Sequence, residues 1–250
     1  MTIAGEIRAA GPPLPNRQIM GQWWRDITFL HWRVPPERVV PLMPRGVTPD
    51  VYDGSAWVGL IPFRMVGGSI GRRGPIPWLG TFCETNVRLY SIDAAGRRGV
   101  VFRSLEAERL LVVTGARIGF NVPYQWARMR MEPQALGEDP AHAHLTYTTR
   151  RRGRAGVGGR ISIEVGAPVP EPTELDHFLT ARFGLHTTIL GRPAWVPNSH
   201  GPWPLRRARL LDLEDSLVAA AGLPGVTGSA PDSVLFSSGV HTVFGLPRRG

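Results

Sequence analysis

The sequence predicts a strand-dominated α+β domain. We expect its sheet to be mostly antiparallel and closed or strongly curved, and three observations support this prediction. Glycine and proline, 30 and 24 residues, recur along the whole chain and favour many short turns. Several segments alternate apolar and polar side chains with the period of a strand. So many consecutive strands would leave exposed edges unless the sheet curved or closed on itself.

The strands and helices are expected in a definite order along the chain. A strand rich in aromatic and β-branched residues is expected at 23–34, and two prolines then open a short helix at 36–42. Further strands are expected at 57–66, 81–92, 99–104, 124–131, 145–149, 160–165, 186–190, 205–213 and 241–244. Further helices are expected at 106–120, from the helical spacing of apolar residues, at 172–183, with Thr173 as a cap, and at 214–221.

The domain organisation is expected to be simple. Residues 1–20 are rich in proline and glycine and should be loosely ordered. No shift in composition marks a boundary beyond them, so a single domain is expected over 21–250. Residues 67–80 are glycine-rich and are expected to form a loop.

All 29 basic residues are arginines, and the chain contains no lysine. A Schiff base with a substrate carbonyl or with pyridoxal phosphate needs a lysine amine, so that chemistry is excluded. The phosphate-binding loop of nucleotide hydrolases and the protein-kinase site are excluded for the same reason. We therefore expect no such cofactor, and indeed none at all.

The net charge of +9 raises the question of a nucleic-acid partner. The arginines are scattered as pairs and one short tract, without a known nucleic-acid-binding motif, so we do not expect one. A nucleic-acid role would need one continuous arginine face and a steep salt dependence. The sequence shows neither a signal peptide nor an apolar run of about 20 residues, so we expect a cytoplasmic protein without a membrane partner.

The segment 81–92, TFCETNVRLYSI, holds the most informative polar pattern. Alternation places Glu84, Asn86 and Arg88 on one face, between Phe82 and Tyr90, whereas the opposite face is an ordinary core face. Two interpretations remain open. The polar face is either a solvated outer face with an ion pair, or the wall of a barrel interior that holds a carboxylate.

Two histidine-containing motifs carry weaker signals. His142 and His144 have a spacing that can chelate a metal, but no third ligand is identifiable, so no metal site is expected. The motif HGPWPL, which begins at His200, fixes its backbone with two prolines. It is either a structural corner whose Trp203 fills the core, or the rim of a pocket in which His200 contacts a ligand.

Several long stretches, in order, resemble the YqjF-like or DUF2071 family of the acetoacetate decarboxylase-like superfamily. They are WRDITFLHWRV, DGSAWVGLIPFRM, GTFCETNVRLY, LLVVTGARIGFNVPYQWARM, FLTARFGL and HGPWPL. The resemblance implies one domain built as a curved, cone-shaped antiparallel β-barrel with peripheral helices and a central cavity. Members of the superfamily often assemble, so the resemblance is also compatible with a homo-oligomer.

The resemblance to acetoacetate decarboxylase extends to individual residues. Arg25 matches an arginine of the first strand and Glu84 a glutamate of a central strand. Arg117 is followed six residues later by proline, as in the enzyme, but Tyr124 and Gln125 stand where the enzyme has two lysines. A general bias from lysine to arginine would have left arginine at these two positions. The imine mechanism of the decarboxylase is therefore excluded.

The site that the resemblance implies consists of catalytic Glu84 and Tyr124, with Arg25, Gln125, Arg117 and His200 as substrate-binding residues. A partly buried Glu84 would have a raised pKa and could exchange protons with a small oxo or carboxylate metabolite. We expect a small-molecule ligand and proton-transfer chemistry without a Schiff base, such as enolisation, dehydration, cyclisation or decarboxylation. The alternative is a non-catalytic ligand-binding or structural protein on the same scaffold.

Overall fold

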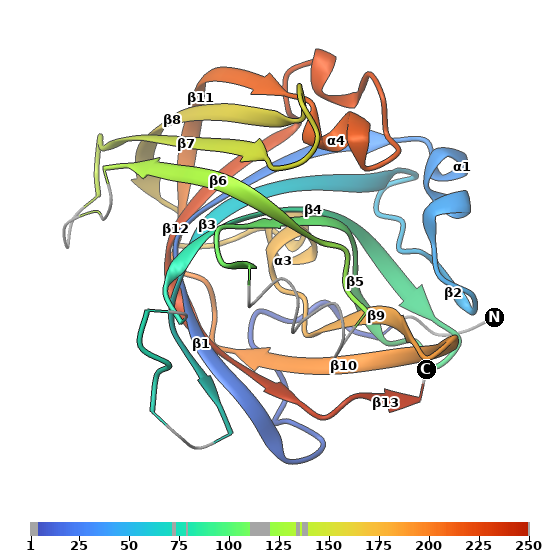
Figure 1. Cartoon of the computed structure of the whole chain (residues 1–250). Helices are drawn as coiled ribbons and strands as arrows, with labels where there is room; N and C mark the ends of the chain where they lie inside the picture. Colours follow the sequence, from blue (N-terminus) through green and yellow to red (C-terminus); the bar gives the residue numbers. More distant parts are fainter. Residues whose placement is uncertain are drawn as a thin grey trace.

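The computed structural model describes residues 5–71, 74–78, 80–110, 121–133, 136 and 140–249. In these residues thirteen strands form one sheet, shown in Figure 1. The strands are β1 Gln18–Val34, β2 Val47–Pro49, β3 Ala56–Ile70, β4 Phe82–Asp93, β5 Arg98–Ala107, β6 Tyr124–Glu132, β7 His144–Arg151, β8 Gly158–Pro168, β9 Gly184–Ile189, β10 Arg192–His200, β11 Leu205–Asp215, β12 Ser233–Gly245 and β13 Arg248–Arg249. The helices are α1 Pro36–Val39, α3 Glu174–Thr180 and α4 Leu217–Ala220, with short 3-10 turns at Val40–Leu42 and Val226–Gly228.

The strand pairings close parts of this sheet into two rings that share a wall of β5, β4, β3, β1 and β12. Strands β9 and β10 connect β5 to β12 and complete the first ring. Strands β6, β7, β8 and β11 connect the same two strands and complete the second ring. In Figure 1 the second ring curves over the top of the molecule, and β10 runs along the bottom. The predicted strand-dominated, curved sheet is confirmed.

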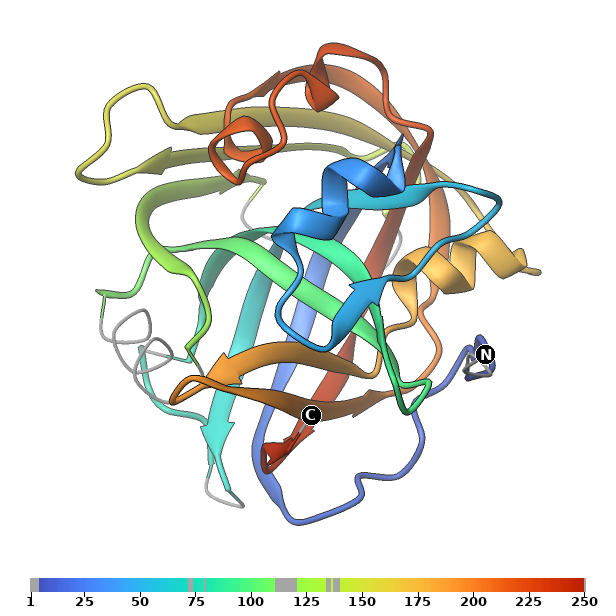
Figure 2. The same cartoon turned by 90° about the vertical axis from the view of Figure 1, so that its right-hand side faces the viewer.

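Each ring has its own hydrophobic cluster, because the shared wall buries both of its faces. From β1, Ile27 and Phe29 pack in the first cluster, together with Phe178 of α3. Leu30 and Trp32, further along the same strand, pack in the second cluster, which α1 and α4 also join. These two helices lie on the side of the molecule that faces the viewer in Figure 2. Alternation along one strand therefore decides which ring a side chain enters.

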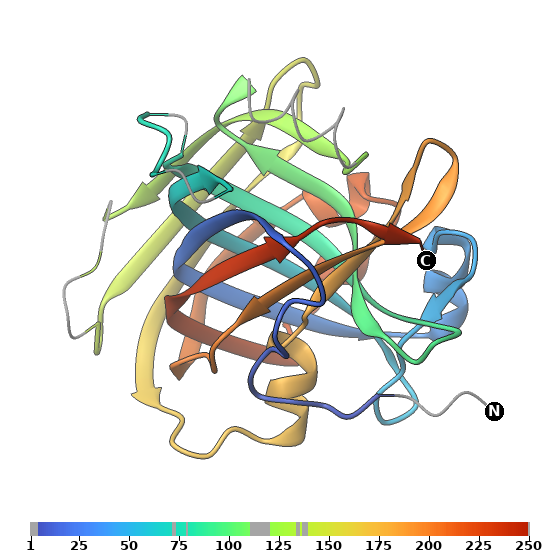
Figure 3. The same ribbon diagram turned by 90° about the horizontal axis from the view of Figure 1, so that it is seen from below.

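Helix α3 forms where the sequence predicts a helix, although it is shorter. Thr173 caps it reciprocally with Asp176: the threonine oxygen accepts from the Asp176 N–H at 3.1 Å, and the carboxylate accepts from the Thr173 N–H at 2.9 Å. Phe178 and Leu179 are completely buried against the first ring. Figure 3 shows the helix beside the sheet, seen from below. The helix thereby presents its last backbone carbonyls to the ring interior.

The structure corrects several sequence-based boundaries. Residues 67–70 continue β3, and Glu106 and Ala107 end β5, whereas we expected a loop and the start of a helix. The remainder of that helix, 111–120, lies outside the described residues. Strand β10 was missed because Pro193 and Pro197 interrupt its pattern. Two pairings, β5 with β6 and β5 with β9, are parallel in an otherwise antiparallel sheet.

No helix in the described part of the chain is both long and apolar enough to cross a membrane.

Candidate functional site

The polar face of β4 lies inside the first ring. Glu84, Asn86 and Arg88 are only 3, 5 and 6% exposed, and Phe82 and Tyr90 on either side belong to the first hydrophobic cluster. Of the two interpretations of this face, the solvated outer face is wrong and the interior wall is correct. A strand that buries polar residues on one face and a core on the other must provide partners for the polar groups.

Glu84 and Tyr124 form the centre of the candidate site. The Tyr124 hydroxyl donates a hydrogen bond to Glu84 Oε2 at 2.9 Å. Tyr124 reaches this position because it begins β6, in parallel register with Leu105 of β5. Burial raises the pKa of Glu84 from 4.5 to about 8, against the opposing effect of this hydrogen bond. Burial and the nearby Glu84 charge raise the pKa of Tyr124 well above 10. Glu84 is therefore a carboxyl group that gains and loses its proton near neutral pH.

Arg88 is a buried cation that donates hydrogen bonds to neutral groups. Its Nε donates to the Tyr90 hydroxyl at 3.1 Å, and its Nη2 donates to the Leu179 carbonyl at 2.7 Å. No acidic side chain of the described residues forms an ion pair with it. Its charge contributes, after burial, to the lowered pKa values of His31 and His200. A buried guanidinium without a carboxylate partner is a suitable contact for an anionic ligand.

Several further polar atoms of the first ring lack a hydrogen-bond partner within the described ranges. They are Asn86 Oδ1, Trp24 Nε1, Asn198 Oδ1, His200 Nε2 and Thr242 Oγ1. Most come from adjacent strands, since Thr242 of β12 pairs with His200 of β10 and the ring of Trp24 lies 6.1 Å from that of His200. Burying an unpaired polar atom costs about 1–3 kcal/mol. Their accumulation on strands of the same ring indicates a place where a polar ligand binds.

Two predicted site residues do not join this set. The Arg25 guanidinium lies over the ring of Trp23, 4.1 Å from its centroid, and Trp23 is 39% exposed. The intervening Trp24 is the residue of this segment that packs with the first ring, so Arg25 faces the other way. Gln125 follows Tyr124 along β6, and alternation turns its half-buried side chain to the opposite face. Arg117 lies outside the described residues.

His200 does lie in the first ring, and only 5% of it is exposed. Its Nδ1 is 2.7 Å from the Gly201 carbonyl, which is the geometry of an N–H donor. Burial lowers the pKa of His200 to about 4, with the Arg88 charge acting in the same direction. The ring is therefore neutral at pH 7, and its unpaired Nε2 is available as an acceptor.

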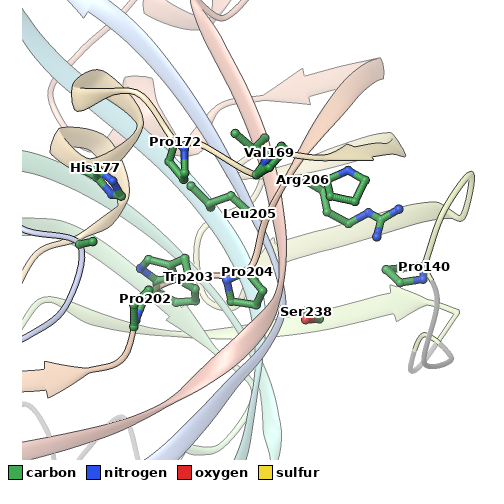
Figure 4. Close-up of a pocket in the computed structure, with 13 residues that line it drawn as sticks. Pro140, Val169, Pro172, His177, Pro202, Trp203, Pro204, Leu205, Arg206 and Ser238 are labelled. Atoms are coloured by element: carbon green, nitrogen blue, oxygen red, sulfur yellow. The ribbon is translucent and has the colours of Figure 1, made fainter.

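The rest of the HGPWPL motif is a structural corner. Trp203 is 7% exposed, stacks on Trp24 with centroids 6.0 Å apart, and donates its indole N–H to the Thr180 carbonyl. On its outer side lies a surface pocket of about 530 Å³ between α3 and the start of β11 (Figure 4). Prolines form much of its lining, and neither Glu84 nor Tyr124 takes part. The motif thus places His200, whose Nε2 has no partner among the described residues, on a rigid corner.

Arg88, Asn86 and Trp24 were not among the predicted site residues. The alternation of 81–92 was the available signal for the first two, because it places them on the face of Glu84. The missing information was three-dimensional. Only the folded chain shows that Arg88 is bound by a carbonyl of α3 and not by a carboxylate.

A second polar cluster lies at the other end of β4. Ser91 Oγ is 2.8 Å from His186 Nδ1, and His186 Nε2 is 3.3 Å from Asp93 Oδ2. Asp93 also accepts from Arg97 Nε at 2.6 Å and from the backbone N–H groups of Ala95 and Arg97. The order serine, histidine, aspartate resembles a nucleophilic triad. Ser91 has no exposed surface, however, and none of these side-chain atoms lacks a partner, so the cluster is structural.

Known proteins resemble this chain at two levels. The family model of DUF2071, described as an uncharacterized conserved protein, matches residues 21–241. The protein YqjF of Bacillus subtilis is 30% identical over 233 residues, which are 92% of either chain.

Solved structures extend the similarity of the fold. The enduracididine biosynthesis enzyme MppR complexed with pyruvate has a TM-score of 0.61 at 16% identity, over 95% of this chain and 91% of that one. Acetoacetate decarboxylase from Legionella pneumophila has a TM-score of 0.64 at 11% identity, over 100% and 92% of the two chains. At such identities they show the fold alone, which is the acetoacetate decarboxylase-like fold expected from the sequence. By the family model and the relative that match it, the chain belongs to the DUF2071 family.

Proposed function

We propose that the first ring binds a small 2-oxo acid and catalyses proton transfer at the carbon next to its carbonyl, without a Schiff base. The observation that carries the proposal is the buried Glu84–Tyr124 pair, joined at 2.9 Å, with a Glu84 pKa of about 8. A general acid or base works best when its pKa is close to the working pH. Burial has brought this carboxyl group to that range.

In this proposal Arg88 and Asn86 bind the substrate, and Glu84 transfers the proton. Arg88 binds the substrate carboxylate, which supplies the anion that its guanidinium lacks within the described residues. Glu84 lies four residues away on the same face, so the two Cα atoms are roughly 13 Å apart. The Glu84 carboxyl group is hydrogen-bonded to Tyr124 and the Arg88 guanidinium to Tyr90 and Leu179, and the proposal places the substrate between these two groups. Asn86 lies between the two and offers its side-chain amide to the substrate carbonyl.

The proton transfer is balanced within this set. The Glu84 carboxylate removes a proton from the carbon, the electron pair of the C–H bond moves to the carbonyl oxygen, and an enolate forms. Hydrogen bonds from the wall stabilise the enolate oxygen. Return of the proton from Glu84 to carbon restores the oxo acid, and Tyr124 holds the carboxyl group in place throughout. The absence of lysine agrees with this route, since no imine is needed.

The choice of a 2-oxo acid rests on the chemistry of the wall and is supported by one structural neighbour. MppR, which shares the fold, was solved in complex with pyruvate. The second candidate function is ligand binding without catalysis. The unpaired atoms of Trp24, His200 and Thr242 favour it, because they would serve a bound ligand even if Glu84 never moved a proton.

The experiment is to incubate the protein with pyruvate in D2O and follow loss of the methyl proton signal by NMR. Exchange above the buffer rate is expected for the wild type, and Glu84→Gln should reduce it to the buffer rate. Ser91→Ala, which changes the structural cluster on the same strand, is the matched control and should retain exchange. Binding of pyruvate with no exchange at any pH from 6 to 9 would favour the binding protein, and absence of both would refute the oxo-acid site.

A further inference from the structure

A second cavity, of about 420 Å³, lies under the N-terminal segment and away from Glu84. Five arginines contribute to its lining, and Glu6 is the acidic residue among them. The arginines are Arg8, Arg97, Arg98, Arg182 and Arg248. Glu6 is not available to balance the interior, because it pairs with Arg8 in an exposed ion pair at 3.1 Å. Arg97 is likewise paired with Asp93, so the positive charge of the cavity comes from Arg98, Arg182 and Arg248.

Arg182 lines this cavity and is itself buried, with 5% of its surface exposed. Its guanidinium lies over the rings of Phe178 and Tyr90, 4.2 and 4.8 Å from their centroids, so its plane is fixed. Its Nε donates to the Phe178 carbonyl at 2.8 Å, and its Nη1 donates to Asp50 Oδ2 at 2.5 Å. Its Nη2 has no hydrogen-bond partner among the residues that the structure describes. This nitrogen is a buried, positioned donor.

The charge around Arg182 is only partly compensated. Asp50 is the carboxylate that binds it, and Asp50 also accepts two hydrogen bonds from Arg98 Nη1, at 2.8 and 2.9 Å. One carboxylate is thus shared by two guanidiniums. The remaining positive charge favours an anion at the free nitrogen of Arg182, since a buried cation is stabilised by a paired acceptor.

The other walls of the cavity fit an apolar ring with a polar substituent. Phe178, Phe183 and Trp195 line it, and Asn198 contributes a buried Oδ1 that is unpaired within the described ranges. The N-terminal segment covers the cavity: the Gly5 N–H donates to the Gly96 carbonyl at 3.0 Å, and Arg98 Nε donates to the Gly5 carbonyl at 2.7 Å. The volume is within the range of small-ligand sites.

We propose that this cavity binds a small aromatic carboxylate, with the carboxylate on Arg182 Nη2 and the ring beside Phe183 and Trp195. The site differs from the first-ring site in its cation and in its ligand, although Asn198 lines this cavity and also belongs to the polar atoms described for the first ring. It would bind this ligand whether or not Glu84 performs proton transfer.

Isothermal titration calorimetry with benzoate at low ionic strength tests this proposal. Benzamide serves as a probe that has the aromatic ring without the negative charge, and inorganic phosphate as one that has the charge without the ring. Benzoate is expected to bind at least tenfold more tightly than either. Arg182→Lys retains a cation for Asp50 but removes the second nitrogen, and should weaken benzoate binding by tenfold or more. Glu84→Gln is the matched control and should leave the affinity for benzoate unchanged.

A second variant and a crystal structure keep the test decisive if Arg182→Lys folds poorly. Arg248→Gln changes an exposed lining residue and should weaken binding of benzoate by a few fold, with a smaller salt dependence. Crystals soaked with 4-iodobenzoate should show the iodine anomalous signal beside Trp195. Equal affinity for benzoate and benzamide, or equal affinity for benzoate and phosphate, would overturn the proposal. So would an iodine position inside the first ring or on the outer surface.

Discussion

The two ends of β4 carry similar residue types in opposite states. At its start, Glu84 is bonded to Tyr124, and the neighbouring Asn86 and Arg88 face a wall that holds several unpaired atoms. At its end, Ser91 and Asp93 are joined through His186, and the backbone and Arg97 complete the bonds of Asp93. Both clusters are buried, and both contain a carboxylate.

The difference is in the hydrogen-bond partners and not in the residue types. The cluster at the end of β4 looks more like a known catalytic site, yet its bonds are all used within the protein and its serine is inaccessible. The cluster at the start looks less familiar, but its cation, Arg88, has no acidic partner among the described residues, and its carboxyl group has a pKa of about 8. Counting the partners of buried polar atoms therefore separates a candidate site from a structural network better than matching residue names does.

The largest expected effect is the loss of proton transfer in Glu84→Gln. Removing the proton acceptor should slow methyl exchange of pyruvate by about 100-fold or more, since general base catalysis contributes roughly 10²–10⁴-fold. Ser91→Ala should change the rate by less than about twofold. The NMR rate of methyl deuteration at saturating pyruvate measures both. Equal losses in the two variants would remove the distinction between the ends of β4.

The next effect is on binding, through Arg88→Met. The variant removes the proposed contact for the substrate carboxylate and should raise the dissociation constant of pyruvate by about 10–100-fold, as expected for a charge-assisted hydrogen bond. Arg97→Met is the matched control at the other end: it removes the ion pair with Asp93 and should lower stability without changing affinity. Titration calorimetry and urea unfolding separate the two outcomes. Unchanged affinity in Arg88→Met would exclude Arg88 as the anion contact.

The pH dependence of stability should have opposite signs at the two ends. The folded pKa of Glu84, about 8, is above its ordinary value of 4.5, so its favourable contribution is complete below pH 4.5 and is lost as the pH rises towards 8. The pKa of Asp93 is lowered by its hydrogen bonds and by Arg97, against the effect of burial. Its contribution is therefore present above its ordinary value and is lost on acidification.

Urea unfolding from pH 2 to 9 tests these signs against single variants. The stability of the wild type relative to Glu84→Gln should fall between pH 5 and 8. Its stability relative to Asp93→Asn should instead rise with pH in the acidic range below 4. A flat Glu84 difference would mean that Glu84 ionises normally in the folded protein.

The smallest expected effect is the stability cost of Ser91→Ala. The variant leaves His186 Nδ1 without its partner in a buried position, so we expect a loss of about 1–3 kcal/mol in urea unfolding. Thr242→Val removes an oxygen that is unpaired within the described residues, and should cost less or stabilise the protein. If both variants lost equal stability, the number of hydrogen-bond partners of a buried polar atom would not indicate how much that atom contributes to the free energy of unfolding.

Sequence reasoning found most of the strands because alternation along one chain is a local property. It placed Glu84, Asn86 and Arg88 together on a face, but it could not decide whether that face was interior. It missed β10, where two prolines obscure the pattern, and it did not anticipate that Arg25 lies over Trp23. Arg25 precedes Asp26, which has a φ of 51° and lies at a register shift between β1 and β3. A match of residue types to another protein does not show in which direction a side chain points at such an irregularity.

The candidate site was predictable only where a resemblance supplied it. Glu84 and Tyr124 come from strands β4 and β6, and their contact depends on the parallel pairing of β5 with β6. The role of Arg88 depends on the Leu179 carbonyl, 91 residues away along the chain, and on ion pairs that it does not form with described residues. Such long-range facts leave no periodic signal in a single sequence.

The most direct test of the central claim is the titration of the Glu84 carboxyl carbon by NMR in protein labelled with 13C-glutamate, assigned by comparison with Glu84→Gln. The structure predicts a pKa of about 8 in the free protein and a change in this titration when pyruvate binds beside the carboxyl group. An ordinary pKa near 4.5, unaffected by pyruvate, would contradict the proposal that the first ring holds a proton-transfer site.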